Sequence, residues 1–263
     1  MSNSSIRDLF LAADGTPRVV RGVAVYSGSP RLAELAIRIG FETVWIEMEH
    51  GPTDFALAEA ICQAAEAPGG TASIRVPDDQ RCHILRALEV GAHAVIVPMV
   101  NTAGQARQVV QFGKFPPLGQ RGYNTRSRAV GFGLLDRSIA FAEANARSHL
   151  FVQIETTEAV ANLDAICGVE GLSGILIGPG DLSMSLGCGG DMTSQALIDT
   201  ATDCIRRARR AGRHAGILVA PGPLLEAAMK AGCDFCFVGG DFTNLIAPWR
   251  QLLEQIPSRC PQS

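Results

Sequence analysis

Two carboxylates, Glu155 and Asp181, each follow a short apolar run and each stand just before a predicted helix start. The runs are residues 150–154 and 175–180. A carboxylate at the end of a buried strand costs free energy unless it is paired, hydrogen-bonded or bound to a cation. On successive parallel strands the two would meet at one edge of the sheet and could hold a divalent metal ion. Capping of the following helices is the alternative, since acidic residues are common in first turns.

Other chemically useful side chains also fall at predicted strand ends. His50 follows the second strand, and a histidine is well matched to proton transfer near neutral pH. Glu47 and Glu49 are near enough in the sequence to orient its imidazole. Arg75 ends the third strand, where a guanidinium could stabilise a developing enolate oxygen beside a metal. A simple salt bridge to Glu47 or Glu155 is the alternative for Arg75.

The segment Gly178-Pro179-Gly180-Asp181 leads into a predicted short helix over 182–186. Free backbone N–H groups at a helix N-terminus bind anions, and glycine lets a ligand approach the backbone closely. Beside a metal, this segment predicts that a 2-oxo acid is bound by its carboxylate.

The lysine content bears on how a carbonyl would be activated. Of 23 basic residues only Lys114 and Lys230 are lysines. Barrel aldolases use either a Schiff base on an inward-pointing lysine or a metal acting as Lewis acid. Lys114 stands at the end of one predicted helix and Lys230 inside another, so neither is on a strand. Carbonyl activation is therefore expected to depend on the metal.

The elements that must position these residues alternate along the whole chain. The expected strands are 19–26, 43–48, 72–76, 94–98, 150–155, 174–177, 215–219 and 233–238. The expected helices are 31–39, 55–65, 81–90, 103–112, 158–167, 194–211, 224–231 and 243–255. Eight strand–helix units in ~250 residues predict an α/β fold of the (β/α)₈ TIM-barrel type. A doubly wound sheet is the alternative, but its G-x-G-x-x-G fingerprint does not follow the first strand.

One long irregular stretch, 116–135, separates the fourth and fifth strands. Loops of this length inside a compact domain are usually functional. Arg126 and Arg128 belong to this loop, which is expected to leave the rim of the barrel that carries the chemistry. They are either solvated surface residues or contacts for an acidic or hydroxylated tail on the aldehyde, in this subunit or a neighbouring one. Of the eight cysteines, Cys233 and Cys236 have C-x-x-C spacing but begin a strand, which favours buried structural thiols.

Bulk properties restrict the partners. A net charge of −3 argues against nucleic acid, because no excess positive charge is available to neutralise phosphates. The amino-terminal residues lack the pattern of a signal peptide, and no apolar run reaches membrane-spanning length. We expect a cytoplasmic protein with small-molecule substrates.

The order and density of these motifs resemble the HpcH/HpaI family of pyruvate-dependent class II aldolases. The resemblance covers nearly the whole chain. It rests on Glu49-His50-Gly51-Pro52, Ile74-Arg75-Val76, 91–100, 116–122, Val152-Gln153-Ile154-Glu155-Thr156, 177–183 and Gly216-Ile217-Leu218.

The resemblance implies one barrel domain over 1–263 in a homo-oligomer, usually a hexamer, whose last helix packs on a neighbouring barrel. It implies Mg²⁺, Mn²⁺ or Co²⁺ held by Glu155 and Asp181, with Gln153 supporting the metal. The reaction implied is reversible cleavage of a 4-hydroxy-2-oxo acid to pyruvate and an aldehyde.

Further roles follow from the same resemblance. His50 would transfer protons and Arg75 would stabilise the enolate. The pyruvate carboxylate would bind the backbone of Gly180 and Asp181. The set of expected substrate-binding residues is Gln153, Gly178, Pro179, Gly180, Asp181, Leu218 and Tyr123.

The chain departs from the family pattern at several of these positions. Glu47 and Glu89 replace two family aspartates and are expected to be catalytic with one extra methylene of reach. Gly180 replaces a usual alanine. Tyr123 stands where relatives often carry a small aliphatic residue, so the aldehyde pocket is expected to be reshaped.

Two other functions remain open. A citrate-lyase-β-like enzyme acting on an acyl-CoA would share the Glu155 and Asp181 pair, but the stretch from Glu49 to Pro52 disfavours it. A non-catalytic barrel that binds a small acid is the other, and the presence of His50 and Arg75 disfavours that one.

Overall fold

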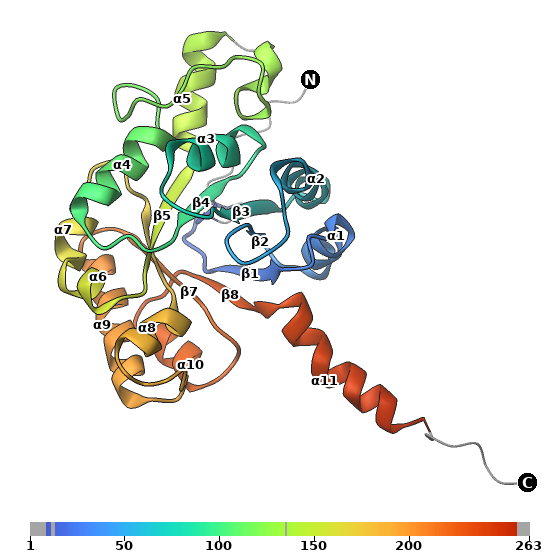
Figure 1. The fold of residues 1–263 in the computed structure, drawn as a ribbon. Coiled ribbons are helices and arrows are strands. Elements are labelled where there is room, and N and C mark those ends of the chain that lie inside the picture. The colour runs from blue at the N-terminus through green and yellow to red at the C-terminus, as the bar shows by residue number, and fades with distance from the viewer. Residues whose placement is uncertain (1–8, 12–13, 135, 257–263) are drawn as a thin grey trace, which may run out of the picture.

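The computed structural model describes residues 9–11, 14–134 and 136–256. Eight parallel strands follow one another in sequence order and close into a barrel, as predicted (Figure 1). The strands are β1 (Val20–Val25), β2 (Thr43–Glu47), β3 (Thr71–Arg75), β4 (Ala94–Val97), β5 (His149–Ile154), β6 (Gly174–Ile177), β7 (His214–Leu218) and β8 (Phe235–Gly240).

Helices connect the strands and surround the barrel. They are α1 (Pro30–Ile39), α2 (Phe55–Glu66), α3 (Arg81–Glu89), α4 (Ala103–Gly113), the 3₁₀ helix η1 (Arg128–Gly133), α5 (Arg137–Arg147), α6 (Thr157–Ala161), α7 (Leu163–Cys167), α8 (Pro179–Ser185), α9 (Gln195–Arg210), α10 (Pro223–Lys230) and α11 (Asp241–Glu254). The single helix expected over 158–167 is divided at Asn162, and α5 was not expected.

The core has two layers. One lies between the strands and the surrounding helices, and the other fills the barrel with Trp45, Phe151 and Phe237. Phe10 packs at the amino end of the barrel, where its ring stacks on His214 with centroids 3.5 Å apart. The interior of the barrel is therefore filled by side chains below its carboxyl end, the rim where barrel enzymes carry their active sites.

The long irregular stretch lies at the amino end of the barrel, whereas it was expected at the carboxyl rim. It follows α4, which has already returned the chain to the amino end of the barrel, and it leads through η1 and α5 into β5. Arg128 in this stretch pairs with Glu66 at the end of α2. The expectation that Arg126 and Arg128 lie near the catalytic rim of their own subunit is wrong.

Helix α11 differs from every other long helix because none of its residues is buried. It extends away from the barrel (Figure 1) and exposes large apolar side chains. These are Phe242, Ile246, Trp249, Leu252 and Leu253. In the described part of the chain, no helix is long and apolar enough to cross a membrane.

The C-x-x-C pair is structural, as expected. Cys233 and Cys236 are both buried and free, and burial raises the pKa of the Cys233 thiol to about 12.

Candidate active site

A pocket of about 450 Å³ opens at the carboxyl end of the barrel. It gathers most of the residues that the sequence singled out. These are His50, Arg75, Gln153, Glu155, Gly178, Pro179, Gly180, Asp181 and Leu218. Residues that the sequence did not single out complete its wall: Trp45, Met192, Thr193, the β7–α10 loop 219–222 and the first two residues of α10.

Glu155 follows β5 directly and is only 2% exposed. Its carboxylate accepts hydrogen bonds from the Met99 backbone N–H at 2.6 Å and from Gln153 Nε2 at 2.9 Å. Met99 adopts a left-handed conformation with φ 55°, which is uncommon for a residue other than glycine. Burial raises the pKa of Glu155 to about 7, and the neighbouring charges of Asp181 and Glu49 push it in the same direction.

Asp181 lies in the first turn of α8, directly after β6. The helix begins at Pro179, so the N–H groups of Gly180 and Asp181 are among those without an intrahelical acceptor. Gly178 leaves room for the carboxylate of Glu155, which follows β5. A Cβ at position 178 would collide with Glu155 Oε2 and lie 2.9 Å from Gln153 Nε2. At Gly180, by contrast, a Cβ would meet nothing within 4 Å.

Glu47 does not orient the imidazole of His50, which corrects one expectation. Its carboxylate is fully buried and accepts from Trp45 Nε1 at 3.0 Å and from Arg75 Nε and Nη2 at 2.9 and 2.6 Å. The other oxygen accepts from the backbone N–H groups of Glu49 and His50. The side chain of Glu47 therefore fixes Arg75 and the turn before His50.

Glu49 is the carboxylate that faces His50. Its Oε2 lies 3.7 Å from His50 Nε2 and 2.9 Å from Arg75 Nη1. Burial raises the pKa of Glu49, and the negative charge of Asp181 contributes in the same direction. The side chain of His50 is 64% exposed, so its imidazole can reach a ligand in the pocket.

The charge balance of the pocket suits a divalent cation. The negative charges of Asp181 and Glu49 raise the pKa of Glu155, and that of Asp181 raises the pKa of Glu49; Arg75 is the basic residue whose charge opposes both shifts. In the described residues, no group of three or more His, Cys, Asp or Glu side chains forms a ready-made metal cage. A cation held by Glu155 and Asp181 would thus keep open positions, as in sites where substrate and water complete the coordination.

Glu89 and Tyr123 do not line this pocket. Glu89 ends α3 at the amino end of the barrel, where it pairs with Arg121 at 2.7 Å. Tyr123 lies nearby and packs edge-on against Phe141. Both residues are too far from the carboxyl rim to act in their own subunit, so their expected roles would require a neighbouring subunit.

Neither lysine is placed for a Schiff base. Lys114 is buried at the end of α4, where Nζ donates to the carbonyl oxygens of Asn145 and Ser148. Lys230 ends α10 and is exposed. Neither lines the pocket.

Trp45 is the main contact that the sequence reasoning missed. It stands two residues before Glu47 on β2, and residues two apart on a strand share a face. Strand alternation could therefore have predicted that Trp45 points into the barrel beside Glu47. The guanidinium carbon of Arg75 lies 5.3 Å from its ring centroid.

Comparison with known proteins identifies the family of this chain. The family model for HpcH/HpaI aldolase/citrate lyase matches residues 22–248. A Salmonella gallinarum protein named 2-keto-3-deoxy-L-rhamnonate aldolase is 37% identical over 228 residues, which cover 84% of this chain and 82% of the relative.

Solved structures of other proteins match this chain in fold. A HpcH/HpaI aldolase/citrate lyase family protein from Burkholderia cenocepacia J2315 superposes with a TM-score of 0.84 at 27% identity, covering 90% of this chain and 94% of the other. An HpcH/HpaI aldolase from Desulfitobacterium hafniense DCB-2 shares the fold with a TM-score of 0.84 at 24% identity, covering 93% and 96%. The barrel, the strand-end residues and these matches together place the chain in the HpcH/HpaI aldolase/citrate lyase family.

Proposed function

We propose that this protein is a divalent-metal-dependent aldolase that reversibly cleaves a 4-hydroxy-2-oxo acid to pyruvate and an aldehyde. The observation that carries the proposal is the meeting of Glu155, Asp181, Arg75 and His50 at one pocket. The name of the 37% identical relative supports a 2-keto-3-deoxy sugar acid as the substrate class.

Glu155 and Asp181 would hold the metal, which when bound would act as a Lewis acid on the 2-oxo group. Mg²⁺, Mn²⁺ and Co²⁺ are the candidates, because carboxylate oxygens suit each of them. Gln153 donates to Glu155 Oε2 at 2.9 Å and so fixes the orientation of one ligand. Hydrogen bonds of this kind set the geometry of a metal ligand.

The other residues divide the chemistry of bond cleavage between them. His50 accepts the proton of the 4-hydroxyl group as the C3–C4 bond breaks and the aldehyde forms. Arg75, clamped by Glu47 and Glu49, stabilises the negative charge that develops on the keto oxygen. The N–H groups of Gly180 and Asp181 bind the carboxylate of the pyruvyl part. C3 then gains a proton to give pyruvate.

Glu49 takes the role that was expected of Glu47 in this scheme. It is the carboxylate that faces His50, at 3.7 Å, and it would orient the imidazole for the proton transfer. Glu47 would not contact the substrate itself; it would act indirectly, by holding the Arg75 guanidinium in place.

The proposal includes a homo-oligomer in which α11 packs on a neighbouring barrel. Its exposed apolar side chains, Trp249 among them, support this arrangement because contiguous exposed apolar surface marks an interaction site. A neighbouring subunit could also bring Glu89 and Tyr123 to the rim of a second active site. A hexamer is the form that the family resemblance favours.

An acyl-CoA lyase and a non-catalytic barrel remain the alternatives. Arg75 is the one arginine or lysine that lines the pocket within the described residues, which leaves little positive charge for a CoA diphosphate. The deciding experiment incubates the protein and Mg²⁺, Mn²⁺ or Co²⁺ with 2-keto-3-deoxy sugar acids, and in parallel with acyl-CoA substrates. Pyruvate release from the sugar acids supports the proposal. Cleavage of acyl-CoA alone, or no turnover of either, would reject it.

A further inference from the structure

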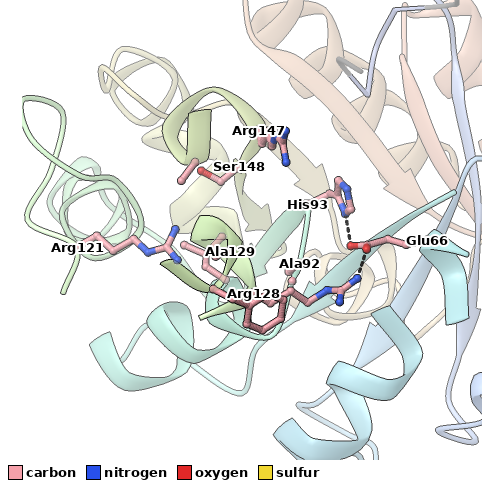
Figure 2. A pocket seen from close by; sticks show the side chains of 12 residues that line it. Glu66, Ala92, His93, Arg121, Arg128, Ala129, Arg147 and Ser148 are labelled. Atoms are coloured by element: carbon pink, nitrogen blue, oxygen red, sulfur yellow. Dashed lines mark hydrogen bonds and ion pairs between the residues drawn. The ribbon is translucent and has the colours of Figure 1, made fainter. Parts of the chain in front are cut away.

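A second cavity, of about 290 Å³, lies at the amino end of the barrel. Its wall comes from segments distant in the sequence: the end of α2, residues 91–93, Arg121, η1 and the end of α5 (Figure 2). Since the active-site pocket is at the carboxyl end and the barrel interior between them is packed, the two cavities are separate.

Basic side chains dominate the polar part of this wall. Arg121, Arg128 and Arg147 all line the cavity (Figure 2). Lys114 stands behind a fourth lining residue, Ser148, and donates to its Oγ at 3.1 Å. Within the part of the chain that the structure describes, no carboxylate forms an ion pair with Lys114, so its charge is compensated only by carbonyl and hydroxyl oxygens.

Three carboxylates face these four basic groups. Glu66 lines the cavity and pairs with Arg128. Glu89 pairs with Arg121 at 2.7 Å, and Glu143 reaches the partly exposed Arg147 at 3.4 Å. Four basic groups and three carboxylates give this region a net charge of +1. Of the three ion pairs, that of Arg147 with Glu143 is the weakest, because it is long and solvent-exposed.

Two nitrogen atoms in the cavity wall have no hydrogen-bond partner among the described residues. They are Nε of Arg121 and Nδ1 of His93, and both atoms are buried. Nδ1 of His93 is 4.0 Å from Glu66 Oε1, which is beyond hydrogen-bond distance. Buried polar groups are normally satisfied, and the Nε of arginine can only donate. Because Nε of Arg121 has almost no accessible surface, the guanidinium must turn toward the cavity before an acceptor oxygen there can reach this donor.

The remaining wall is apolar. Leu88, Ala92, Ala144 and Phe132 contribute to the same cavity. An apolar wall beside guanidinium groups fits a ligand with a short carbon skeleton better than it fits a bare inorganic ion.

We propose that this cavity binds a small organic anion, through a phosphate or carboxylate group that reaches the guanidinium groups of Arg121 and Arg147. Arginine recognises both groups by charge-assisted hydrogen bonds, often in a bidentate manner. The carbon skeleton lies on the apolar wall, and Glu66 stays on Arg128. This site is independent of the proposed aldolase reaction and stands or falls separately from it.

The test is isothermal titration calorimetry on the Mg²⁺-loaded protein with two probes, glycerol 3-phosphate and glutarate. The parent is compared with Arg147→Gln and with Ala129→Phe, which fills the cavity. Lys230→Gln is the matched control for loss of an exposed positive charge. Asp181→Asn reports any binding at the carboxyl-end pocket. Circular dichroism checks that each variant is folded.

We expect at least one probe to bind with saturation, and the probe that binds identifies the anionic group. Arg147→Gln should weaken this binding about tenfold or more, since charged hydrogen bonds are the strong ones. Ala129→Phe should abolish it, while Lys230→Gln and Asp181→Asn leave it unchanged. Failure of both probes to bind overturns the proposal, as does binding that Asp181→Asn removes and Arg147→Gln leaves intact.

Discussion

Glu47 and Arg75 form a buried ion pair in which Nε and Nη2 of the arginine both donate to one carboxylate oxygen, at 2.9 and 2.6 Å. Glu49 holds the third nitrogen, Nη1, at 2.9 Å. The guanidinium is thereby fixed in position and orientation before a substrate arrives. Preorganised donors of this kind are the largest single contribution to many enzymatic rates.

Replacement of Arg75 by lysine should impair the chemical step severely. Lysine keeps the charge but cannot contact two carboxylates and a substrate oxygen at once. We expect kcat for pyruvate formation to fall by roughly 10²–10³-fold, with KM less affected. Arg38→Lys, at an exposed ion pair on α1, is the control. A kcat for Arg75→Lys within about threefold of the parent would leave Arg75 with a structural role only.

Replacement of Glu47 and Glu49 by glutamine should separate two roles. Every partner of the Glu47 carboxylate is a donor, so an amide NH₂ at this buried position must face another donor. Glu47→Gln should lower the free energy of unfolding by about 3–5 kcal/mol. Glu49→Gln should leave stability nearly unchanged and shift the pH–rate profile, because it removes a carboxyl group whose pKa is raised by burial. Chemical denaturation and pH profiles of kcat check both; equal effects of the two variants would refute the division.

Gly178 and Gly180 should differ sharply in their tolerance of alanine. The new Cβ at position 178 collides with Glu155 Oε2, whereas at 180 the space is open. Gly178→Ala should weaken metal binding at least tenfold, and Gly180→Ala should retain it. Calorimetric titration with Mn²⁺ measures both. Similar affinities in the two variants would contradict the placement of Glu155 as a ligand.

Metal affinity should rise with pH through about 7. Burial raises the pKa of Glu155 to about 7 from a value near 4.5, so the metal-free protein carries a proton there at mildly acidic pH. That proton must leave before the metal binds. Affinity should therefore fall up to about tenfold per pH unit below 7. The same raised pKa stabilises the metal-free fold below pH 4.5 and loses this effect as the pH rises through 7. A Mn²⁺ affinity that is constant between pH 5.5 and 7.5 would be inconsistent with this.

Helix α11 should hold the assembly together. Trp249→Glu places a charge on its exposed apolar face and should dissociate the oligomer to the 27.8 kDa protomer. Leu35→Glu alters an exposed apolar residue on α1 and serves as control. Light scattering after size exclusion measures the mass. An unchanged assembly in Trp249→Glu would exclude α11 from the interface.

The fold and most of the pocket could be predicted because parallel strands bring their carboxyl ends to one rim. Residues that directly end a strand, such as Arg75 and Glu155, fall into place from sequence position alone. The contacts of the Glu47 side chain could not be predicted, because sequence spacing does not say whether this long side chain turns toward Arg75 or toward His50. The stretch 116–135 was expected at the wrong end of the barrel for two reasons. Its position was judged from the preceding strand and not from α4, which returns the chain to the amino end, and α5 was not expected. The roles proposed for Glu89, Tyr123 and α11 in an oligomer depend on a second chain, whose position one sequence does not give.

Carbonyl activation in the proposed reaction depends on a metal held by Glu155 and Asp181. The most direct measurement is exchange of the methyl protons of pyruvate in D₂O, followed by NMR without any aldehyde. Exchange should require Mg²⁺, Mn²⁺ or Co²⁺, stop with EDTA, and be lost in Glu155→Gln and Asp181→Asn. Exchange that persists in EDTA, together with a pyruvate adduct trapped by borohydride on Lys114 or Lys230, would contradict the account.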